Sequence, residues 1–290
     1  MRAIHTPDKD APETVADSQY VNLSGYRFIW LNYLPVLQAD LHSALAQTGV
    51  KGTILLADEG INVALAGTAS QCEAARKVLN ADERLRDLWL KESISEVLPF
   101  SKLKVRIRHE IIAFDGPDAG DRQLHRMQAP ALAPETVASW IDSDKDFTLL
   151  DTRNTYEVES GTFGTARHLD IGHFRDFQQA VAKGLSEGSL DLEKPVVTFC
   201  TGGIRCEKAA PWMLEQGFKE VYQIEGGVLN YFERTGGKHW NGDCFVFDDR
   251  VEVDTRLQPT GATWCTHCQL TIQPGEVCRC QLSSTADEIV

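Results

Sequence analysis

The sequence predicts an α+β unit followed by an α/β unit with a parallel sheet, and three observations support this fold class. The chain has 290 residues, a length that suggests about two domains. Its first part orders strand-like and helical segments as β-α-β-β-α-β, whereas its second part alternates strands with helices. Between them, residues 116–133 carry Gly, Pro and Asp without periodicity, which is typical of a domain linker.

The first unit, residues 23–115, is predicted from its segments in order. YRFIWLNYL is strand-like, and LQADLHSALAQTG is a helix that ends at Gly49. KGTILLADEGINVALAG predicts two strands around a tight turn at Asp58 and Glu59. The helix SQCEAARKVLNADERLRDLWL and the long alternating strand KLKVRIRHEIIAF complete the unit. This order is that of a ferredoxin-like split βαβ sandwich, and the polar residues 1–22 before it predict a flexible tail.

The second unit, residues 134–236, opens with the short helix PETVASWI. Its strands DFTLLDTR, VVTFC and EVYQIEGG alternate with the helices CEKAAPWMLEQG and VLNYFERTGG, which predicts a parallel sheet with helices on both faces. Functional groups of such sheets lie at the carboxyl ends of strands, and Cys200 is at such an end. Pro211 predicts a kink or a separate first turn in its helix. Residues 237–290 contain a strand-like run, CFVFDDRVEV, and form a Cys-rich appendage.

The bulk composition limits the class of protein. Hydrophobic residues make up 42% and charged residues 24%, which is typical of a folded, soluble chain. No apolar run approaches the ~20 residues that span a bilayer, and the N-terminus has no apolar segment of a secretory signal. We therefore expect a cytoplasmic protein without a membrane partner. The net charge of −13 argues against general affinity for nucleic acid but leaves room for a local basic patch.

The stretch VVTFCTGGIRCEKAA, residues 196–210, predicts a reactive thiol at Cys200. The start of a helix offers unpaired N–H groups and about half a positive charge, and Arg205 adds a full charge. Such surroundings lower the pKa of a cysteine from about 8.5 to about 3.5–7.5. The two glycines let several amides face one point, as in an anion-binding nest. We therefore predict Cys200 and Arg205 as the catalytic pair. The loop predicted to cradle the anion comprises Thr201, Gly202, Gly203, Ile204 and Cys206.

Three alternatives bear on this loop. A buried structural cysteine would explain Cys200 alone, but the glycine pair, Arg205 and the helix start favour catalysis. A cysteine phosphatase needs five residues between its cysteine and arginine, whereas four separate Cys200 from Arg205, which fits a sulfur species better than a phosphoryl group. Cys206 either resolves or protects a persulfide on Cys200, or it is a small residue packed under the loop.

The second unit resembles a rhodanese domain. LLDTRNTYEVESGTFGTARHLDI, CTGGIRCEKAA and GFKEVYQIEGGVLNYF carry the resemblance and cover most of the domain in order. It implies that Cys200 carries a persulfide, that Arg205 helps to bind an anionic donor, and that Asp151 and Arg153 form a structural pair. One departure is GTF at residues 161–163, where the family often has Gly-His-Ile.

The whole chain resembles the tRNA uridine hydroxylase family, in which an acylphosphatase-like domain precedes a rhodanese domain. GTILLADEGINVALAG and FSKLKVRIRHEIIAF ahead of CTGGIRCEKA carry this resemblance over roughly residues 25–250. It implies oxygen-dependent C5 hydroxylation of the wobble uridine, position 34, with dioxygen as co-substrate and the tRNA anticodon stem-loop as partner. No haem, flavin or iron motif is evident. The alternative is a thiosulfate or persulfide sulfurtransferase, or a sulfur carrier, with a small-molecule or protein donor. The intact loop disfavours a non-catalytic interaction module.

A row of cations is predicted in SKLKVRIRH. Alternate residues of a strand share a face, so four cations at even positions form a row about 20 Å long that could follow a phosphate backbone. These residues are Lys102, Lys104, Arg106 and Arg108. The alternative is a solvated edge strand, where lysine blocks aggregation; the family resemblance favours RNA contact.

Two further features are left open by the sequence. Asp58 and Glu59, with Asn62 just after, either serve the turn itself or reach across to the Cys200 site. The tail reads Cys-x2-Cys-x9-Cys-x-Cys, with His267 inside, which is consistent with a structural zinc ion held by four thiolates. The candidate ligands are Cys265, Cys268, Cys278 and Cys280. A half-used or redox-labile cluster is the alternative.

Overall fold

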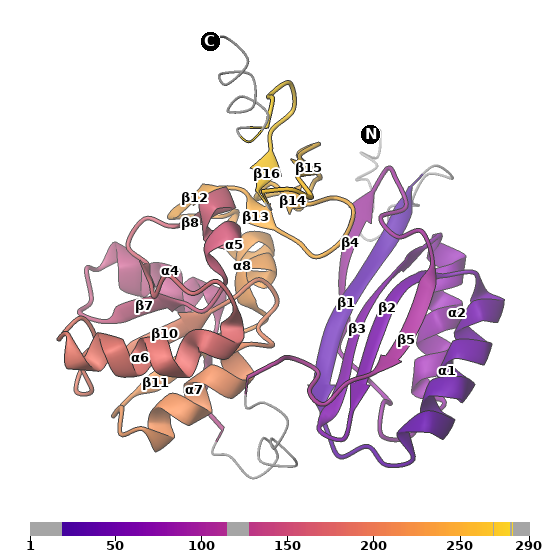
Figure 1. The fold of residues 1–290 in the computed structure, drawn as a ribbon, viewed down its shortest axis with the longest axis horizontal. Coiled ribbons are helices and arrows are strands. Elements are labelled where there is room, and N and C mark those ends of the chain that lie inside the picture. The colour runs from indigo at the N-terminus through magenta and orange to yellow at the C-terminus, as the bar shows by residue number, and fades with distance from the viewer. Residues whose placement is uncertain (1–18, 115–127, 269, 279, 281–290) are drawn as a thin grey trace, which may run out of the picture.

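The computed structural model describes residues 19–114, 128–268, 270–278 and 280 (Figure 1). The predicted flexible tail therefore lies outside the described residues up to residue 18, as does the predicted linker up to residue 127. In the described remainder, residues 20–22 and Ala131–Leu132 lie in strands. The first strand begins at Tyr20, and a short strand at Ala131–Leu132 joins the second sheet, so both predicted boundaries move by a few residues.

The first domain is a five-stranded sheet with two helices on one face. Its elements are β1 (Tyr20–Phe28), α1 (Leu34–Thr48), β2 (Lys51–Ala57), β3 (Gly60–Gly67), α2 (Ala69–Asn80), β4 (Lys91–Ser95) and β5 (Leu103–Ile107). The strand order is β4-β1-β3-β2-β5, with β2 parallel to β5 and the other neighbours antiparallel. The predicted β-α-β-β-α-β order is confirmed with one strand added. That strand, β4, follows the second predicted helix, which ends at Asn80 and is shorter than expected.

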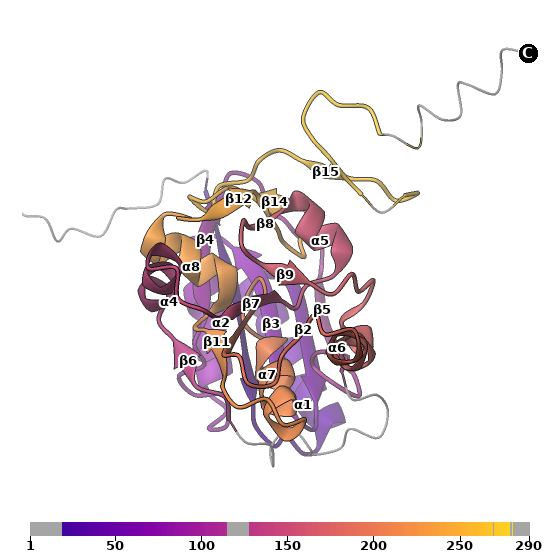
Figure 2. The ribbon, with the colours of Figure 1, turned by 90° about the vertical axis from the view of Figure 1, so that its left-hand side faces the viewer.

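The two faces of this sheet differ in composition. The face under α1 and α2 is apolar because residues such as Leu23, Ile54 and Val63 alternate toward the helices and form one core. The other face carries small, polar and aromatic side chains, and Figure 1 shows it turned toward the second domain. These residues are Ser24, Tyr26, Thr53, Leu55, Asn62 and Ala64. Figure 2 looks through the second domain onto the strands of this sheet.

The second domain has the predicted parallel sheet with helices on both faces. Its elements are β6 (Ala131–Leu132), α4 (Pro134–Asp142), β7 (Thr148–Asp151), α5 (Thr155–Ser160), β8 (Gly161–Phe163), β9 (Arg167–His168), η1 (Phe174–Asp176), α6 (Phe177–Ser186), β10 (Val196–Phe199), α7 (Cys206–Glu215), β11 (Val221–Ile224) and α8 (Gly227–Thr235). The strand order is β6-β11-β10-β7-β9. One core packs α6 and α7 against the sheet, and a second core packs α4 and α8 against its other face. Pro211 lies inside α7, which continues through it, so the first turn is not a separate element.

The C-terminal extension is more integrated than an appendage. Its strands are β12 (Trp240–Gly242), β13 (Cys244–Phe245), β14 (Glu252–Val253), β15 (Thr263–Trp264) and β16 (Thr271–Ile272). β12 pairs with β8, and Trp240 packs in the core with Phe163, their ring centroids 5.0 Å apart. The run CFVFDDRVEV, predicted as one strand, forms the antiparallel pair β13–β14 around a turn. Among the described residues, no helix is long and apolar enough to cross a membrane.

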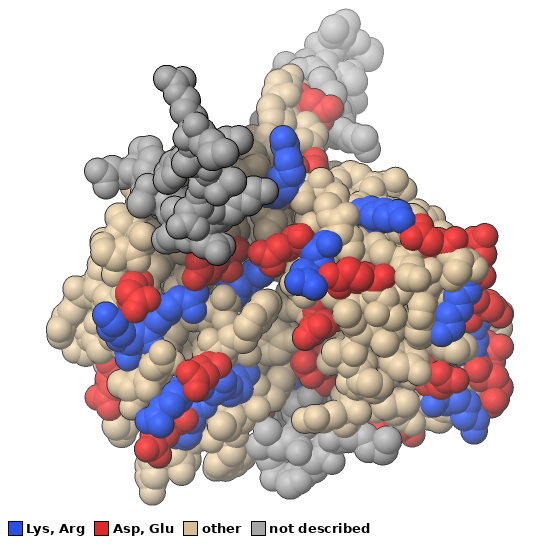
Figure 3. Space-filling model, turned by 180° about the vertical axis from the view of Figure 1, so that it is seen from behind, with Lys and Arg blue, Asp and Glu red and all other residues tan. Residues whose placement is uncertain are grey.

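Buried and polar contacts join the two domains. Nζ of Lys208, fully buried on α7, lies 2.8 Å from Oε2 of Glu59 and 2.6 Å from Oε2 of Glu110, both in the first domain. Lys91 on β4 forms an ion pair with Glu233 on α8. On the side that Figure 3 shows, acidic and basic side chains are interspersed over both domains. The domain interface itself is joined by specific charge pairs, those of Lys208 and of Lys91 described above.

Candidate active site

Cys200 follows β10 at the carboxyl end of the sheet, where the sequence predicts it. The thiol is fully buried from bulk solvent, and the N–H of Gly203 donates to its Sγ at 3.1 Å. The start of α8 fixes the loop from the other side, because Val228 N–H donates to the Cys200 carbonyl at 2.9 Å. Gly227 has φ +67° at this contact, and a Cβ there would lie 2.4 Å from that carbonyl oxygen. Only glycine fits such a position.

The electrostatics of the loop favour a thiolate at Cys200. Burial alone would raise the pKa of this thiol. The hydrogen bond from Cys206 and the charge and hydrogen bonds of Arg205 outweigh burial and lower the pKa to about 5. At neutral pH the sulfur is therefore ionised and nucleophilic. Gly203 N–H donates to the sulfur and the backbone N–H of Arg205 lowers its pKa, so two amides of the predicted nest face Cys200.

Arg205 is held by a buried carboxylate. Nη1 and Nη2 of Arg205 donate to the two oxygens of Glu157 at 2.5 and 2.7 Å, and Glu157 on α5 is fully buried. Burial lowers the pKa of this guanidinium, but the Glu157 charge raises it well above its ordinary value, so it stays charged. Glu157 was not predicted as a partner of Arg205, because it lies 48 residues upstream in the chain. This pairing makes Arg205 a fixed neighbour of Cys200 and leaves its charge less available to an anionic donor than the rhodanese resemblance implies.

Cys206 is the first residue of α7 and is fully buried. Its Sγ lies 3.8 Å from the hydroxyl of Thr152. Burial, together with the neighbouring Cys200, raises the pKa of Cys206 well above its ordinary value, so it stays a thiol. Of the roles left open by the sequence, the geometry fits a packed residue that also donates its S–H to the Cys200 thiolate.

Asp151 and Arg153 form the predicted structural pair. Nη2 of Arg153 lies 2.6 Å from Oδ2 of Asp151, and both side chains are completely buried. The same guanidinium donates to the carbonyl of Gly161 at 2.6 Å, and Thr162 donates to Asp151 at 2.9 Å. The pair therefore organises the segment in which the sequence departs from the rhodanese pattern, and that segment forms β8.

Cys200 opens into a cleft between the two domains with a volume of about 470 Å³. One wall is the polar face of the first sheet, and the opposite wall is the Cys200 loop. The extension supplies the rim through Phe247, Asp248 and Arg250. Arg250 holds the extension in place by donating to Ser93 of the first domain at 2.8 Å. These rim residues were missed because they lie in a distant segment without a recognisable motif.

Tyr26 joins the first sheet to the catalytic loop. Its hydroxyl donates to Oε1 of Glu207 on α7 at 3.3 Å and would lie 2.8 Å from a Cβ on Gly203. Burial first, and then the Glu207 carboxylate, raise the pKa of Tyr26, so the phenol keeps its proton. Gly203, with φ +94°, is therefore required both by its backbone conformation and by this close approach.

The hairpin tip reaches the second domain behind the catalytic loop. Glu59 contacts Lys208 and accepts the N–H of Ile111 at 2.7 Å. Asn62, three residues on, lines the cleft itself. The tip therefore contacts α7 across the interface at Lys208, whereas a reach to Cys200 itself stays a prediction.

The strand that carries the predicted row of cations is shorter than expected. β5 ends at Ile107, so Lys104 and Arg106 lie in the strand while Lys102 and Arg108 flank it. Lys104 pairs with Thr53 and Arg106 with Leu55, both of which line the cleft. The row therefore lies on the same sheet face as the cleft, at the edge seen at the front of Figure 1. None of the four cations forms an ion pair within the part of the chain that the structure describes.

The four C-terminal cysteines come together as the spacing predicts. Their Sγ atoms all lie within 4.8 Å of one another. Tetrahedral Zn–S bonds of about 2.3 Å separate sulfurs by about 3.8 Å, and the observed separations include 3.6 Å between Cys265 and Cys280 and 3.2 Å between Cys268 and Cys278. The donor set and its spacing therefore fit a zinc ion. His267 is not among the clustered ligands.

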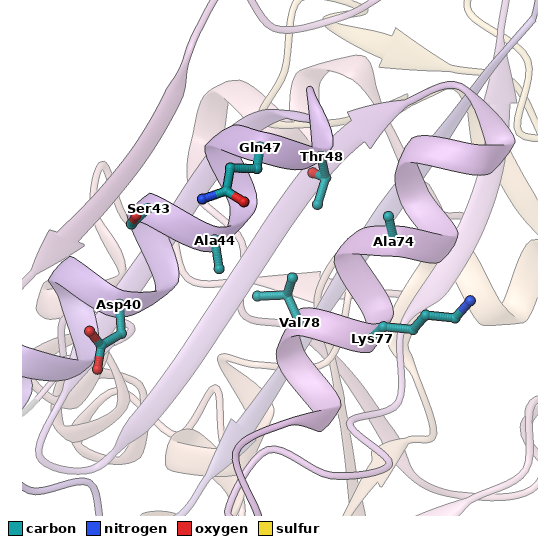
Figure 4. A pocket seen from close by; sticks show the side chains of 8 residues that line it. All are labelled: Asp40, Ser43, Ala44, Gln47, Thr48, Ala74, Lys77 and Val78. Atoms are coloured by element: carbon teal, nitrogen blue, oxygen red, sulfur yellow. The ribbon is translucent and has the colours of Figure 1, made fainter.

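A second hollow, of about 480 Å³, lies between α1 and α2 on the outer side of the first domain (Figure 4). Its side chains include Asp40, Gln47, Lys77 and Val78. The sheet separates this hollow from Cys200, and no predicted site residue lines it. We therefore assign the chemistry to the interdomain cleft.

Comparison with known proteins agrees with this two-domain arrangement. Residues 20–111 match the UPF0176 acylphosphatase-like domain, and residues 133–234 match the rhodanese-like domain. A tRNA uridine(34) hydroxylase of Bordetella petrii is 47% identical over 83% of this chain and 96% of its own length. One of Thiobacillus denitrificans is 45% identical over 86% of this chain and 99% of its own. The polysulfide-sulfur transferase of Wolinella succinogenes is 27% identical over 42% of this chain and 85% of its own, with a TM-score of 0.32. From the two matching domains and the two hydroxylase relatives, at 47% and 45% identity, we conclude that the chain belongs to the tRNA uridine(34) hydroxylase family.

Proposed function

We propose that this protein is an oxidoreductase that hydroxylates C5 of uridine 34 in tRNA, with Cys200 as its reactive group. The observation that carries the proposal is the Cys200 thiolate at the base of a cleft between the two family domains. Cys200 is among the residues that line this cleft, on the wall opposite the first sheet. A tRNA substrate would also make the protein cytoplasmic.

Dioxygen is the proposed co-substrate. Replacing C5–H by C5–OH uses one oxygen atom of dioxygen, and the other leaves as water after taking up two electrons and two protons from a separate two-electron reductant that the reaction requires as a further co-substrate. The residues that line the cleft hold the reactive sulfur, keep it ionised and enclose the site on three sides. Enclosure matters because it keeps water from competing for reactive species.

The proposal is tested by mass spectrometry of tRNA nucleosides from cells that lack the gene. We expect 5-hydroxyuridine derivatives to disappear, to return with the wild-type gene, and to stay absent with Cys200→Ser. The matched control is Cys72→Ser, which changes another buried cysteine in the core of the first domain. Nucleosides that are unchanged by the deletion, in a strain without another enzyme for this modification, would contradict the proposal.

A sulfur carrier or sulfurtransferase is the second candidate function. The observation in its favour is the Cys200 thiolate in a loop shared with rhodanese domains. A persulfide on Cys200, detected by mass spectrometry of the intact protein together with unchanged tRNA nucleosides, would support this function over hydroxylation.

We also propose that the basic row binds the phosphates of the tRNA anticodon stem-loop. Lys104 and Arg106 project from the edge strand on the same face as the cleft. A nucleic acid that reaches Cys200 across this face would therefore pass over them. Charge reversal at Lys104 and Arg106, followed by measurement of tRNA binding, tests this proposal.

We propose a structural zinc ion at the four C-terminal cysteines. The ion would fix the loop that carries β15 and β16, and Trp264 on β15 packs against Phe245 with ring centroids 5.2 Å apart. The purified protein is expected to hold one zinc ion per chain by elemental analysis, and Cys268→Ser with Cys278→Ser to lose it. Cys72→Ser is the control, and a wild-type protein without zinc after purification in its presence would contradict the site.

A further inference from the structure

We infer that the interdomain cleft holds one unstacked uracil base, read by the side-chain amide of Asn62 on the sheet wall. This inference rests on the proposed function and names the residue that selects the base. In it, the imide edge of uracil, O2, N3–H and O4, meets Asn62, and the C5–C6 edge faces the opposite wall. That opposite wall carries Cys200.

The charges of the cleft point to a neutral occupant. Three of the described residues that line it are cations, and each already has a carboxylate partner. Lys91 pairs with Glu233, Arg205 with Glu157, and Arg250 with Asp248 at 2.6 Å. A thiosulfate or phosphate dianion would therefore find no uncompensated cation in the cleft, whereas a neutral base needs none. The volume of about 470 Å³ is in the range of small-molecule sites, about 300–1,000 Å³.

The sheet wall offers hydrogen-bonding groups that the described chain leaves unused. The Nδ2 of Asn62 donates to the carbonyl of Ile111 at 3.3 Å, which sets the orientation of the amide. Its Oδ1 has no hydrogen-bond partner among the described residues, and neither have the hydroxyls of Ser24 and Thr53. Polar groups that line a mostly apolar cleft and lack partners are the expected anchors of a ligand.

The orientation of the amide selects uracil over cytosine. Oδ1 can accept N3–H of uracil while the second hydrogen on Nδ2 donates to a uracil carbonyl, which makes two hydrogen bonds. A cytosine in the same position does not match this pattern, because its N3 accepts a hydrogen bond and would face Oδ1. An amide that flipped to donate to this N3 would lose the contact with Ile111, and a cytosine that shifted by one position to pair N4–H and N3 with the unflipped amide would move its C5 away from the place that uracil C5 takes. The cleft therefore discriminates between the two pyrimidines through one residue.

The strand register connects this base site to the basic row. Tyr26 on β1 lies opposite Asn62 on β3, Asn62 lies opposite Leu55 on β2, and Leu55 lies beside Arg106 on β5. Neighbouring strands are about 4.8 Å apart, so Arg106 lies roughly 10 Å from Asn62 across the sheet. A base in the cleft thus leaves its backbone within reach of Arg106 and Lys104. Phosphate contacts position the RNA, and the contact with Asn62 specifies the base.

The test compares anticodon stem-loop RNAs that differ only in having U or C at position 34, with binding followed by fluorescence anisotropy at one fixed salt concentration. Wild type is expected to prefer U34 by about 5- to 150-fold, the range that one bidentate contact to a base provides. Asn62→Ala is expected to remove the preference, and Asn62→Asp to shift it toward C34, because a carboxylate accepts from the cytosine amine. Gln47→Ala is the matched control: it removes an exposed amide from the outer hollow (Figure 4) and should keep the wild-type preference.

A U/C preference that survives in Asn62→Ala would overturn this inference while leaving the proposed function intact. The inference would also be overturned, with the proposed function intact, by a wild-type protein that hydroxylates uridine 34 but binds the U34 and C34 RNAs equally. Tests of the wild type alone avoid any folding defect of a variant: an RNA with 5-iodouridine at position 34 should cross-link to cleft residues such as Tyr26 or Phe247. Cross-links elsewhere would overturn the inference, whereas loss of the proposed function shows itself separately in unchanged tRNA nucleosides.

Discussion

The chemistry of single residues centres on how a buried sulfur keeps a negative charge. Cys200 has no contact with bulk solvent, and burial by itself disfavours the thiolate. The opposing contributions come from two residues of the same short loop, Cys206 through its hydrogen bond and Arg205 through its charge and hydrogen bonds. The second cysteine of the motif therefore has a role in ionising the first, apart from any redox exchange.

Removing the Cys206 thiol should raise the pKa of Cys200. The pKa of about 5 depends first on the hydrogen bond from Cys206 among the contributions that lower it. In Cys206→Ala the thiolate loses that donor, so the rate of Cys200 alkylation by iodoacetamide at pH 6 should fall several-fold. At pH values above the raised pKa, Cys200 is ionised in wild type and in Cys206→Ala alike, so the alkylation rates of the two proteins converge. Peptide mass spectrometry at each pH measures the rate at Cys200 alone.

The matched variant is Cys206→Ser, which keeps a hydrogen-bond donor of similar size. Its alkylation profile should stay closer to that of wild type. If Cys206→Ala and Cys206→Ser shift the alkylation profile equally, the hydrogen bond does not cause the low pKa of Cys200. The packing of the buried Cys206 thiol is then the cause.

At the scale of elements, β5 links the candidate RNA surface to the cleft. Only Lys104 and Arg106 lie within the strand, and both neighbour residues of β2 that line the cleft. Their position on an edge strand also fits protection against aggregation. Binding measurements decide between these roles, since only an RNA contact changes affinity for tRNA.

Charge reversal at Lys104 and Arg106 should weaken tRNA binding and reduce its salt dependence. Two lost phosphate contacts lower the slope of log K against log salt by roughly 1.4–1.8. Thiosulfate turnover, if the protein has it, should stay intact because the Cys200 loop is untouched. The matched control reverses two exposed cations of the second domain, Lys183 and Lys219. Wild-type affinity in the Lys104→Glu and Arg106→Glu double variant would show that the strand is only a solvated edge.

Local patterns allowed most elements of this fold to be predicted. The hairpin signal around the turn at Asp58 and Glu59 identified β2 and β3, and the GG–Arg–helix pattern identified the Cys200 loop, because both signals lie within a few consecutive residues. The strand predicted after Lys102 stops at Ile107 since Glu110 turns to pair with Lys208. Tertiary contacts of this kind override a period-two pattern, and they have no local signal.

Only the wall of the candidate site that the Cys200 loop forms could be predicted, because a single sequence motif encodes that loop. Cys200 and Arg205 lie close together in the chain, so spacing was sufficient to find them. The opposite wall and the rim come from segments far apart: Tyr26 contacts Glu207 across 181 residues, and Arg250 contacts Ser93 across 157. A single sequence carries no information on such pairs, because their distance depends on how the two domains pack.

For the whole molecule, the active site exists only while the two domains stay docked. One wall of the cleft belongs to each domain. A buried contact close to the catalytic loop is that of Lys208 with Glu59 and Glu110, and Lys208 lies two residues after Cys206. A single buried cation between two carboxylates cannot be removed without leaving uncompensated charge in the interface.

Lys208→Met should therefore lower the free energy of unfolding by about 3–5 kcal/mol, the usual effect of breaking a buried ion pair on one side. Urea denaturation followed by tryptophan fluorescence measures the change. The matched control is Lys194→Met, which removes an exposed ion pair with Asp146 and should change stability by no more than about 1 kcal/mol. Adding Glu59→Gln and Glu110→Gln to Lys208→Met should recover most of the loss, because the buried carboxylates are then neutral. Equal effects of Lys208→Met and Lys194→Met would show that the cluster does not hold the domains together.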